Sequence, residues 1–192
     1  MTSFATTLAS TPSHVSQIHA IMVANQKTAL DASVAAANGF LSIEFSLEYL
    51  TVMLKTTPPV IAISNSDGKE KVVGYALAVT KEVALSNEFL AEGIVYLESN
   101  GIYKGTQIKT LKYLVMGQIC VADRFRGIGV VPVLYKTFAE EYRKRGYDVV
   151  CTEVARLNTR SFRAHQKAGW VVFGSMISAV GVTWDMILLD LR

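Results

Sequence analysis

Residues 124–132, with the sequence Arg-Phe-Arg-Gly-Ile-Gly-Val-Val-Pro, have the composition of a phosphate-binding turn. They stand between an apolar run and a segment with helical spacing. The first N–H groups of a helix lack intrahelical partners and lie at the positive end of its dipole, so a glycine turn there can surround a pyrophosphate with backbone donors. Pro132 is compatible with this role, because a proline near the first helical position removes an N–H that would be unpaired anyway.

Two better-known phosphate motifs fit this turn poorly. A P-loop needs Gly-x-x-x-x-Gly-Lys-Ser/Thr, and no Lys-Ser or Lys-Thr pair follows these glycines. A dinucleotide turn needs Gly-x-Gly-x-x-Gly, which counted from Gly127 and Gly129 places Pro132 at the third glycine. A simple strand-to-helix connection with incidental arginines is the alternative interpretation of the turn taken by itself, since short glycine motifs recur by chance.

The elements around the turn predict a strand, helix, strand unit over residues 112–154. Residues 113–121 are almost continuously apolar, as expected for a strand covered on both faces. Residues 148–154 form the second strand, parallel to the first and joined to it by a right-handed crossover. A short helix is predicted to begin at Asn158 and end at Gly169. The helix between the two strands ends at Gly146, and its apolar face is formed by Val131, Leu134, Tyr135, Phe138 and Tyr142.

The rest of the chain reads as one α/β unit, so residues 1–192 are predicted to be a single domain. An extended segment at 3–8 precedes helices near 11–22 and 47–54. Segments 60–63 and 72–79 are β-rich, and Asp67-Gly68 between them predicts an antiparallel hairpin. Residues 82–111 are interpreted as an insertion with one short helix near 88–97 and a turn at 103–105. Segments 170–173 and 182–191 are the closing strands.

Two stretches of the chain resemble the motifs of the GNAT family of acyl-CoA N-acyltransferases. Residues 121–129, Val-Ala-Asp-Arg-Phe-Arg-Gly-Ile-Gly, are similar to the family's run from its fourth strand into the Arg/Gln-x-x-Gly-x-Gly/Ala turn. Residues 158–170, which begin with Asn-Thr-Arg-Ser and end with Ala-Gly-Trp, are similar to its second motif, which begins with Asn and ends near Gly-Phe. The resemblance is strong over residues 112–174, extends to element order over 11–80, and is absent over 82–111.

The resemblance implies an α/β fold of the α+β kind, with a mixed, mostly antiparallel central sheet of about six to seven strands, helices on both faces and one parallel β-α-β unit. The preferred register of the turn is Arg126-x-x-Gly129-x-Val131, with valine in place of the last small residue. The overlapping frame that starts at Arg124 fits the letters but shifts the helix. Asp123 stands where proline is common in the family. His165 replaces the tyrosine that members often use as general acid.

The resemblance also implies acetyl-CoA as the cofactor and assigns residues to it. Backbone amides of residues 127–131 are expected to hold the CoA pyrophosphate, and the main chain of residues 119–121 to pair with the pantetheine arm as an added strand would. Arg126 adds positive charge, and Asn158 contacts the pantetheine arm. The cofactor-binding residues predicted in this way are Ile119, Cys120, Val121, Arg126, Gly127, Ile128, Gly129, Val130, Val131 and Asn158.

The chemistry of acyl transfer to an amine calls for a base and an acid. The amine is protonated at neutral pH, and a departing thiolate with an ordinary thiol pKa of about 8.5 benefits from a proton. Glu153 lies where similar family members place a catalytic glutamate, and His165 could donate to the thiolate. A main-chain N–H near Val121 would polarise the thioester carbonyl. As alternatives, Glu153 pairs with Arg156 or Arg160, and His165 is a packed helix residue.

Cysteine use and charge limit the partners. Cys120 and Cys151 fall in apolar strands and are interpreted as structural, and no spacing of Cys or His predicts a metal site. Residues 1–100 contain 5 basic and 9 acidic residues, a net charge of −4, and residues 101–192 contain 14 and 7, a net charge of +7. The second half should therefore attract anions, and a small polyanion fits better than nucleic acid because no long basic run is present.

The sequence thus predicts an N-acetyltransferase that moves an acetyl group from acetyl-CoA to an amine, small molecule or peptide, by direct attack in a ternary complex. The alternative is an acyl-CoA-binding sensor or scaffold without catalysis, favoured by the missing tyrosine. No apolar stretch is long enough to span a bilayer and no signal peptide is recognised, so a cytoplasmic location without membrane contact is expected. A homodimer is possible, because closing strands in such folds often pair between subunits.

Overall fold

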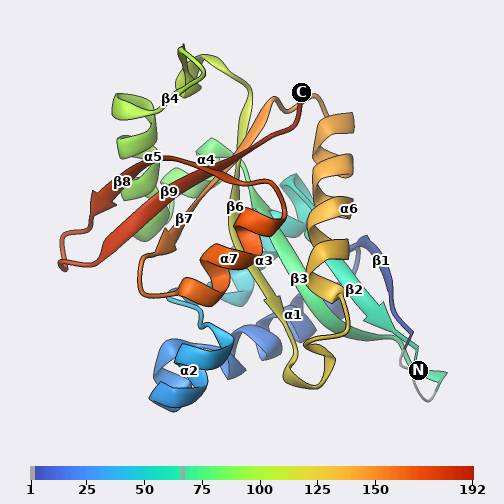
Figure 1. The fold of residues 1–192 in the computed structure, drawn as a ribbon. Helices are drawn as coiled ribbons and strands as arrows, with labels where there is room; N and C mark the ends of the chain where they lie inside the picture. Colours follow the sequence, from blue (N-terminus) through green and yellow to red (C-terminus); the bar gives the residue numbers. More distant parts are fainter. Residues whose placement is uncertain (1–2, 66–67) are drawn as a thin grey trace.

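The computed structural model describes residues 3–65 and 68–192 (Figure 1). These residues form a seven-stranded sheet in the order β1-β2-β3-β6-β7-β9-β8 and a separate two-stranded ribbon, β4-β5. The strands of the sheet are β1 (Ala5–Leu8), β2 (Val60–Ser64), β3 (Lys71–Val79), β6 (Tyr113–Val121), β7 (Val149–Ala155), β8 (Val171–Ile177) and β9 (Thr183–Asp190). The ribbon is made of β4 (Ile102–Tyr103) and β5 (Thr106–Gln107).

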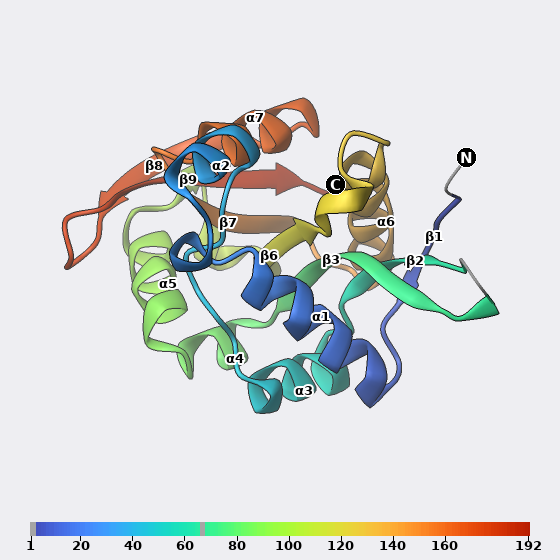
Figure 2. The ribbon, with the colours of Figure 1, turned by 90° about the horizontal axis from the view of Figure 1, so that it is seen from below.

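Helices cover both faces of the sheet, as the view from below shows (Figure 2). Helices α6 and α7 lie on one face, and α1, α3, α4 and α5 lie on the other. The helices are α1 (Pro12–Ala24), α2 (Ala32–Asn38), α3 (Leu47–Thr56), α4 (Lys81–Leu85), α5 (Glu88–Asn100), α6 (Val130–Lys144) and α7 (Thr159–Lys167), with short 3₁₀ turns at Lys27–Ala29, Ile108–Thr110 and Asp123–Phe125.

The predicted fold class is confirmed. Neighbouring strands of the sheet are antiparallel except β6 and β7, which are parallel and are joined by α6. The hairpin of β2 and β3 is present in the predicted place; Asp67 of its turn lies outside the described residues, and Gly68 has a φ of +71°, a conformation that favours glycine. No helix within the described ranges is both long and apolar enough to cross a bilayer.

Strands β6 and β7 pair over a short distance and then separate. Their register runs from Tyr113 opposite Val149 to Val115 opposite Cys151, and no pairing follows between the described residues of the two strands beyond that point. The hydroxyl of Thr152 donates a hydrogen bond of 2.8 Å to the carbonyl of Met116, where the strands part. The sheet is therefore open in its middle, in front of the turn that leads into α6.

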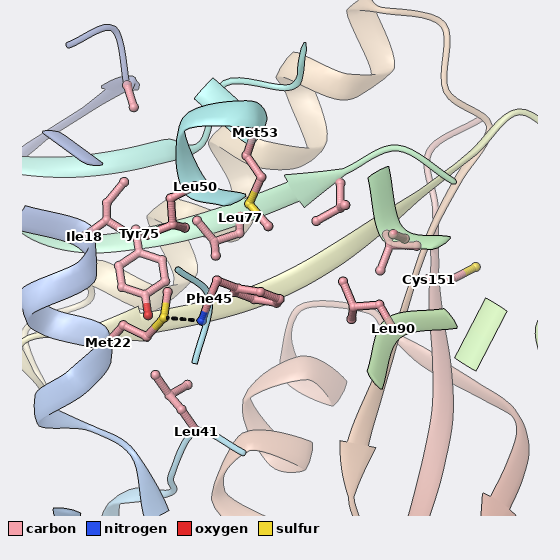
Figure 3. Close-up of a cluster of buried hydrophobic side chains, with 14 of the residues drawn as sticks. Ile18, Met22, Leu41, Phe45, Leu50, Met53, Tyr75, Leu77, Leu90 and Cys151 are labelled. Atoms are coloured by element: carbon pink, nitrogen blue, oxygen red, sulfur yellow. Dashed lines mark hydrogen bonds between the residues drawn. The ribbon is translucent and has the colours of Figure 1, made fainter. Parts of the chain in front are cut away.

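Each face of the sheet carries its own buried cluster. Alternation along the strands sends successive side chains to opposite faces, so Cys151 faces the layer of α1, α3 and α5 while Val150 faces α6. The first cluster includes fully buried Phe45 and Tyr75, and the Phe45 N–H donates to the Met22 sulfur at 3.2 Å (Figure 3). The second is built around the predicted apolar face of α6. The two layers hold the sheet rigid on either side of the gap.

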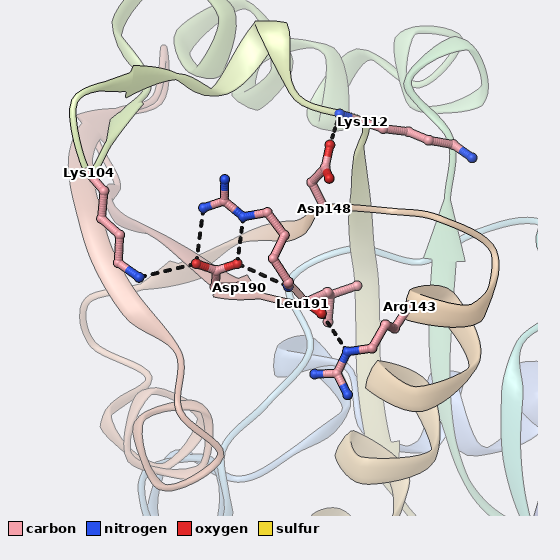
Figure 4. A network of polar contacts seen from close by, with 7 residues as sticks. Lys104, Lys112, Arg143, Asp148, Asp190 and Leu191 are labelled. Carbon is pink, nitrogen blue, oxygen red and sulfur yellow. Dashed lines mark hydrogen bonds and ion pairs between the residues drawn. The ribbon is translucent and has the colours of Figure 1, made fainter.

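The segment at 82–111 contains more structure than the single short helix expected. Helix α5 begins after Asn87, whose side chain accepts from the Leu90 N–H at 3.1 Å, and α4 precedes it. The expected turn at 103–105 is present in the β4-β5 ribbon. Lys104 in this turn forms an ion pair of 3.3 Å with Asp190 at the end of β9 (Figure 4). The segment is thereby tied to the sheet.

The C-terminal end of β9 is also tied to α6 and β7. The Nε of Arg143 donates to the Leu191 carbonyl at 2.5 Å, and the N–H of Leu191 donates to the Asp148 carbonyl at 2.9 Å (Figure 4). The Lys112 N–H donates to the Asp148 carboxylate at 2.8 Å. These contacts hold the closed end of the β6-β7 pair, opposite the end at which the strands diverge.

Candidate active site

A cavity of about 1020 Å³ occupies the gap between β6 and β7. Its lining comes from both faces of the sheet: Tyr135 of α6 and His165 of α7 on one side, and Gly93 of α5 and Glu153 of β7 on the other. The cavity therefore connects the α6-α7 layer with the layer that contains α5. It also reaches the turn at the start of α6 and the segment after α2.

The turn before α6 presents backbone donors. Gly127 and Gly129 have φ values of +77° and +91°, which explains why glycine occupies both positions. A Cβ at either glycine would have no neighbour within 4 Å, so the space beside the turn is open. Within the described part of the chain, nothing accepts a hydrogen bond from the N–H groups of Gly127, Ile128, Gly129, Val130 and Val131. The start of α6 is thus suited to an anion.

The guanidinium of Arg126 is already engaged. Its Nε donates to the Val121 carbonyl at 3.3 Å, one Nη donates to Asp123 at 3.1 Å, and the other Nη donates to the Asn25 side chain. Arg126 therefore holds the turn against β6 and α1 in addition to contributing positive charge. Arg124, by contrast, is exposed and forms no hydrogen bond or ion pair with another described residue.

The positive charge of the second half of the chain gathers at the cavity. The net charge of the second half predicted a positive region, but no sequence motif indicated which basic residues form it. Five cationic residues besides Arg126 line the cavity. Two are on α6, Lys136 and Arg143, and three are on α7, Arg160, Arg163 and Lys167. They make the α6-α7 side of the cavity electropositive.

The main chain of residues 119–121 faces the gap on one side. Ile119, Cys120 and Val121 are opposite Ala76, Tyr75 and Gly74 on β3, so one edge of this part of β6 is paired. The other edge points to the side from which β7 has departed, and no described strand pairs with it. An extended ligand with amide groups could add to such an edge.

The side chain of Asn158 is used mainly for structure. Its Oδ1 caps α7 by accepting from the Ser161 N–H at 3.3 Å, and its Nδ2 donates to the Phe40 carbonyl at 2.8 Å. The residue lines the cavity but is 7% exposed. For a ligand, the side chain retains one amide hydrogen, the second lone pair of Oδ1 and its packing surface.

Glu153 lies on the α5 side of the cavity without a cationic partner. Neither arginine suggested as its partner pairs with it: Arg156 forms an ion pair of 2.5 Å with Asp185, and Arg160 forms no ion pair with a described residue. Burial, and secondarily the negative charge of Glu92, raises the pKa of the Glu153 carboxyl to about 8. A carboxyl with this pKa can exchange a proton with an amine near neutral pH.

His165, which the sequence predicts as the acid, lies in the α6-α7 side of the cavity lining. The side chain is 4% exposed and packs edge-on against Tyr135 and Trp170, with ring centroids 5.2 and 5.0 Å away. Its Nδ1 donates to the Ser161 carbonyl at 2.9 Å, which leaves Nε2 as an acceptor. Burial lowers the pKa of the imidazole to about 4. His165 is therefore neutral at pH 7 and has no imidazolium proton to give.

The lowered pKa of His165 predicts a pH-dependent contribution to stability. Between pH 6.5 and about 4 the unfolded chain binds a proton at this residue and the folded chain does not, so stability falls as pH falls through that window. We expect His165→Phe to remove this contribution. The melting temperature of wild type minus that of the variant, measured from pH 7 to pH 4, should decrease on acidification. A constant difference would show that His165 titrates normally.

Three further side chains near the gap have structural roles. Burial raises the pKa of the Cys120 thiol to about 11 and that of Cys151 still further, so neither supplies a thiolate at neutral pH. Gln118 accepts from the Tyr75 hydroxyl at 2.6 Å and donates to the Ile43 carbonyl at 2.8 Å. Among residues 3–65 and 68–192, no group of three or more His, Cys, Asp or Glu is placed to bind a metal ion.

Comparison with known proteins gives matches in structure but not in sequence. No protein-family model and no curated protein sequence matches the chain. The NatC complex bound to Gag peptide and CoA contains a chain that is similar over 98% of this chain and 99% of its own, with a TM-score of 0.68 and 13% identity. An acetyltransferase of the GNAT family from Streptococcus pneumoniae matches over 99% and 100%, with a TM-score of 0.64 and 14% identity.

A third structure carries a ligand of the expected kind. The yncA protein of Salmonella typhimurium, solved with its cofactor acetyl-CoA, matches over 98% of this chain and 94% of its own, with a TM-score of 0.61 and 15% identity. At these identities the likeness concerns the fold, and it extends over nearly the whole chain, including the parallel β6-α6-β7 unit. The protein described here has the fold of the GNAT acetyltransferases.

Proposed function

We propose that this protein is an N-acetyltransferase that transfers an acetyl group from acetyl-CoA to an amine by direct attack in a ternary complex. One observation supports this most strongly: the unpaired N–H groups at the start of α6 lie at a cavity that passes between β6 and β7 and is lined by Glu153 on its α5 side. An anion-binding turn and a proton-accepting carboxyl are thereby connected through the sheet. The structural neighbours that contain CoA or acetyl-CoA support the same assignment.

The residues at the α6 end of the cavity fit the diphosphate of CoA. The N–H groups of residues 127–131 would bind it, and the cations of α6 and α7 would neutralise its charge. The edge of β6 at residues 119–121 that no described strand pairs with suits the amides of the pantetheine arm, which would place the thioester at the gap; the Val121 carbonyl also accepts from Arg126. Acetyl-CoA supplies an acetyl carbon bonded to a good leaving group. A backbone N–H near Val121 would polarise the carbonyl.

Glu153 would act on the acceptor. Its carboxylate takes one proton from the acceptor ammonium, which frees the nitrogen lone pair. The amine nitrogen attacks the acetyl carbon and forms the new C–N bond, the C–S bond breaks, and the sulfur departs with the bonding electrons. The acylated nitrogen loses its second proton to solvent, and the departing thiolate takes one up from solvent, so that the products are the amide and the CoA thiol. The approach of the amine is confined by the walls of the cavity, so reacting atoms meet in a fixed orientation. Because His165 is neutral, we assign it no proton transfer to the sulfur; its Nε2 is an acceptor.

The acceptor is a small molecule or a peptide with a free amine. The NatC complex, one chain of which resembles this one, is bound to a peptide. One side of the cavity is lined by α5, a segment without a counterpart in the motifs that carry the family resemblance. The protein is expected to work in the cytoplasm, without nucleic acid and as a possible homodimer.

A CoA-binding protein without catalysis is the second candidate, because His165 replaces the usual tyrosine and is not protonated. Such a sensor or scaffold would bind acetyl-CoA through the same turn but would not consume it.

The deciding experiment is a CoA-release assay with acetyl-CoA against polyamines, amino acids, aminoglycosides and N-terminal peptides, preceded by isothermal titration with acetyl-CoA. We expect micromolar or tighter binding and CoA release that depends on both enzyme and amine. Binding without turnover on any amine would favour the sensor. Salt-dependent binding of RNA with no heat of acetyl-CoA binding would reject both assignments.

A further inference from the structure

We infer that the inserted helix α5 is a working part of the acceptor site, with Gly93 as a positioning residue for the Glu153 carboxylate and Glu92 as the neighbouring charge that adjusts it. The inference rests on the proposed function, because it concerns the residue that deprotonates the amine. The sequence motifs of the family do not include this segment, so neither residue is marked by them.

The close approach of Gly93 and Glu153 is the geometric basis. A Cβ built on Gly93 would lie 2.5 Å from Oε2 of Glu153, closer than two such atoms can pack, and 3.2 Å from its Cδ, which is a tight contact. Glycine in a helix interior costs about 1 kcal/mol relative to alanine. At the centre of the 13-residue helix α5, glycine therefore indicates that space is needed at this point for the carboxylate.

Glu153 depends on this contact because nothing else holds its carboxylate. No described residue donates a hydrogen bond to it or forms an ion pair with it. A side chain without polar partners takes its position from packing. The surface that it packs against is the backbone of α5 at Gly93, so a change there moves the carboxylate directly.

Helix α5 is itself fixed, so it cannot retreat to make room. Its inner face buries Leu90, Ile94 and Leu97, which are 5% exposed or less. At its last turn Glu98 forms an ion pair of 2.5 Å with Lys81 and accepts from the Tyr113 hydroxyl at 3.0 Å. An added methyl group at Gly93 would be accommodated by the Glu153 carboxylate, which is the end of a flexible side chain without a polar partner, and not by the helix.

The charges around Glu153 are few. The carboxylate of Glu92 on α5 repels the carboxylate of Glu153. It accepts a hydrogen bond of 3.1 Å from the Ala179 N–H, in the connection between β8 and β9. On β9, Met186 stands opposite Glu153, and on β7 Arg156 is paired with Asp185. Because Glu92 carries the same charge, it disfavours the ionised form of Glu153 and adds to the effect of burial on its pKa.

The test measures the protonation of Glu153 directly and then the reaction. We would titrate Glu153 by NMR of protein with ¹³C-labelled glutamate carboxyls, assigned with Glu153→Gln. Glu92→Gln, which adds no bulk, should lower the titration midpoint of Glu153. Gly93→Ala should also lower the midpoint, because the displaced carboxylate moves from its desolvated position toward solvent. Unchanged midpoints in both variants would overturn the inference whether or not turnover is found.

Kinetics then separate positioning from general damage. With an amine substrate, Gly93→Ala should lower kcat/KM by about 100-fold, the loss typical of a misplacement of about 1 Å, with unchanged acetyl-CoA affinity. The ascending limb of the pH profile should move to lower pH in both variants. The matched control is Gly174→Ala on β8, whose Cβ would lie 2.5 Å from the hydroxyl of Tyr96 on α5. Met186 of β9 is opposite both Gly174 and Glu153 and separates the two residues. An equal loss in Gly174→Ala would attribute the effect to movement of α5 and sink the assignment of Gly93.

These results distinguish the two levels of the proposal. If wild type releases no CoA with any amine while the NMR midpoints shift as expected, the transferase assignment fails and the control of Glu153 by α5 stands. If wild type is active and Gly93→Ala matches it in kcat/KM and in pH profile, the transferase stands and the role of α5 fails.

Discussion

Replacing Glu153 with glutamine should lower kcat/KM for an amine acceptor by about 100-fold or more, the range typical for loss of a general base. Glutamine keeps the shape of the side chain and its packing against α5 but cannot take a proton. The affinity for acetyl-CoA, measured by isothermal titration, should stay within about twofold, because the site proposed for the diphosphate lies across the sheet. Asp190 is the other acidic residue among the described residues that line the cavity, and it is paired with Lys104 and Arg192.

The pH dependence gives this result its signature. Wild type should show a rise in kcat/KM that levels off near pH 8, since burial and Glu92 raise the pKa of Glu153 to about 8. Glu153→Gln should lack this rise. The variant should also gain thermal stability relative to wild type as pH increases, because a carboxyl with a raised pKa loses stability as it ionises between pH 4.5 and 8.

The control for charge is Glu88→Gln, which makes the same chemical change at an exposed position in the first turn of α5. It should keep the wild-type rate and pH profile. Wild-type turnover in Glu153→Gln would remove Glu153 from the mechanism, and equal losses in both variants would assign the effect to the net charge of α5.

Replacing Gly127 with aspartate should weaken acetyl-CoA binding by about 100-fold or more. The new side chain would enter the open space beside the turn and bring a negative charge to the place proposed for the diphosphate. Losing one or two charge-assisted hydrogen bonds, each worth about 1.5–3 kcal/mol, is sufficient for a loss of this size. Isothermal titration measures it at two salt concentrations, since part of the effect is electrostatic.

Gly105 offers a closely matched control. Its φ of +78° is nearly that of Gly127 at +77°, a Cβ at either position meets nothing within 4 Å, and both residues are exposed. Gly105→Asp in the β4-β5 turn therefore introduces the same backbone strain and the same charge at a position outside the cavity. Both variants should lose similar stability, and Gly127→Asp alone should lose affinity. Equal affinities in the two variants would show that the diphosphate binds elsewhere.

The elements with strong periodicity were predictable from the sequence. The apolar run at 113–121 is β6 with the same bounds, and the helical pattern that begins near Val131 is α6. The short, alanine-rich α2 and the 3₁₀ turns carry no such pattern, because a few residues cannot show a period. Helix α4 and the full length of α5 were missed for a different reason: their positions are set by packing against the sheet and by ion pairs such as Lys81–Glu98.

The sequence predicted which residues lie at the candidate site better than it predicted their hydrogen bonds and protonation. Glu153 and His165, on either side of Asn158 in the sequence, line the same cavity. The sequence cannot show that the Asn158 side chain forms hydrogen bonds with the backbone of Ser161 and Phe40. The neutral state of His165 follows from Tyr135 and Trp170, which pack around it in the fold. The contact of Gly93 with Glu153 joins residues 60 positions apart, and a lone glycine in a helix was the one visible sign of it.

The short parallel pairing of β6 with β7 leaves few backbone hydrogen bonds between the two halves of the sheet. Three residue pairs, from Tyr113–Val149 to Val115–Cys151, join the half that contains β1, β2 and β3 to the half that contains β8 and β9. A molecule that binds between β6 and β7 would contact both halves of the sheet. At a concentration 100 times its Kd, it would add about 2.7 kcal/mol to the free energy of unfolding. The persistence of this protein in a cell would then follow the supply of the molecule it binds.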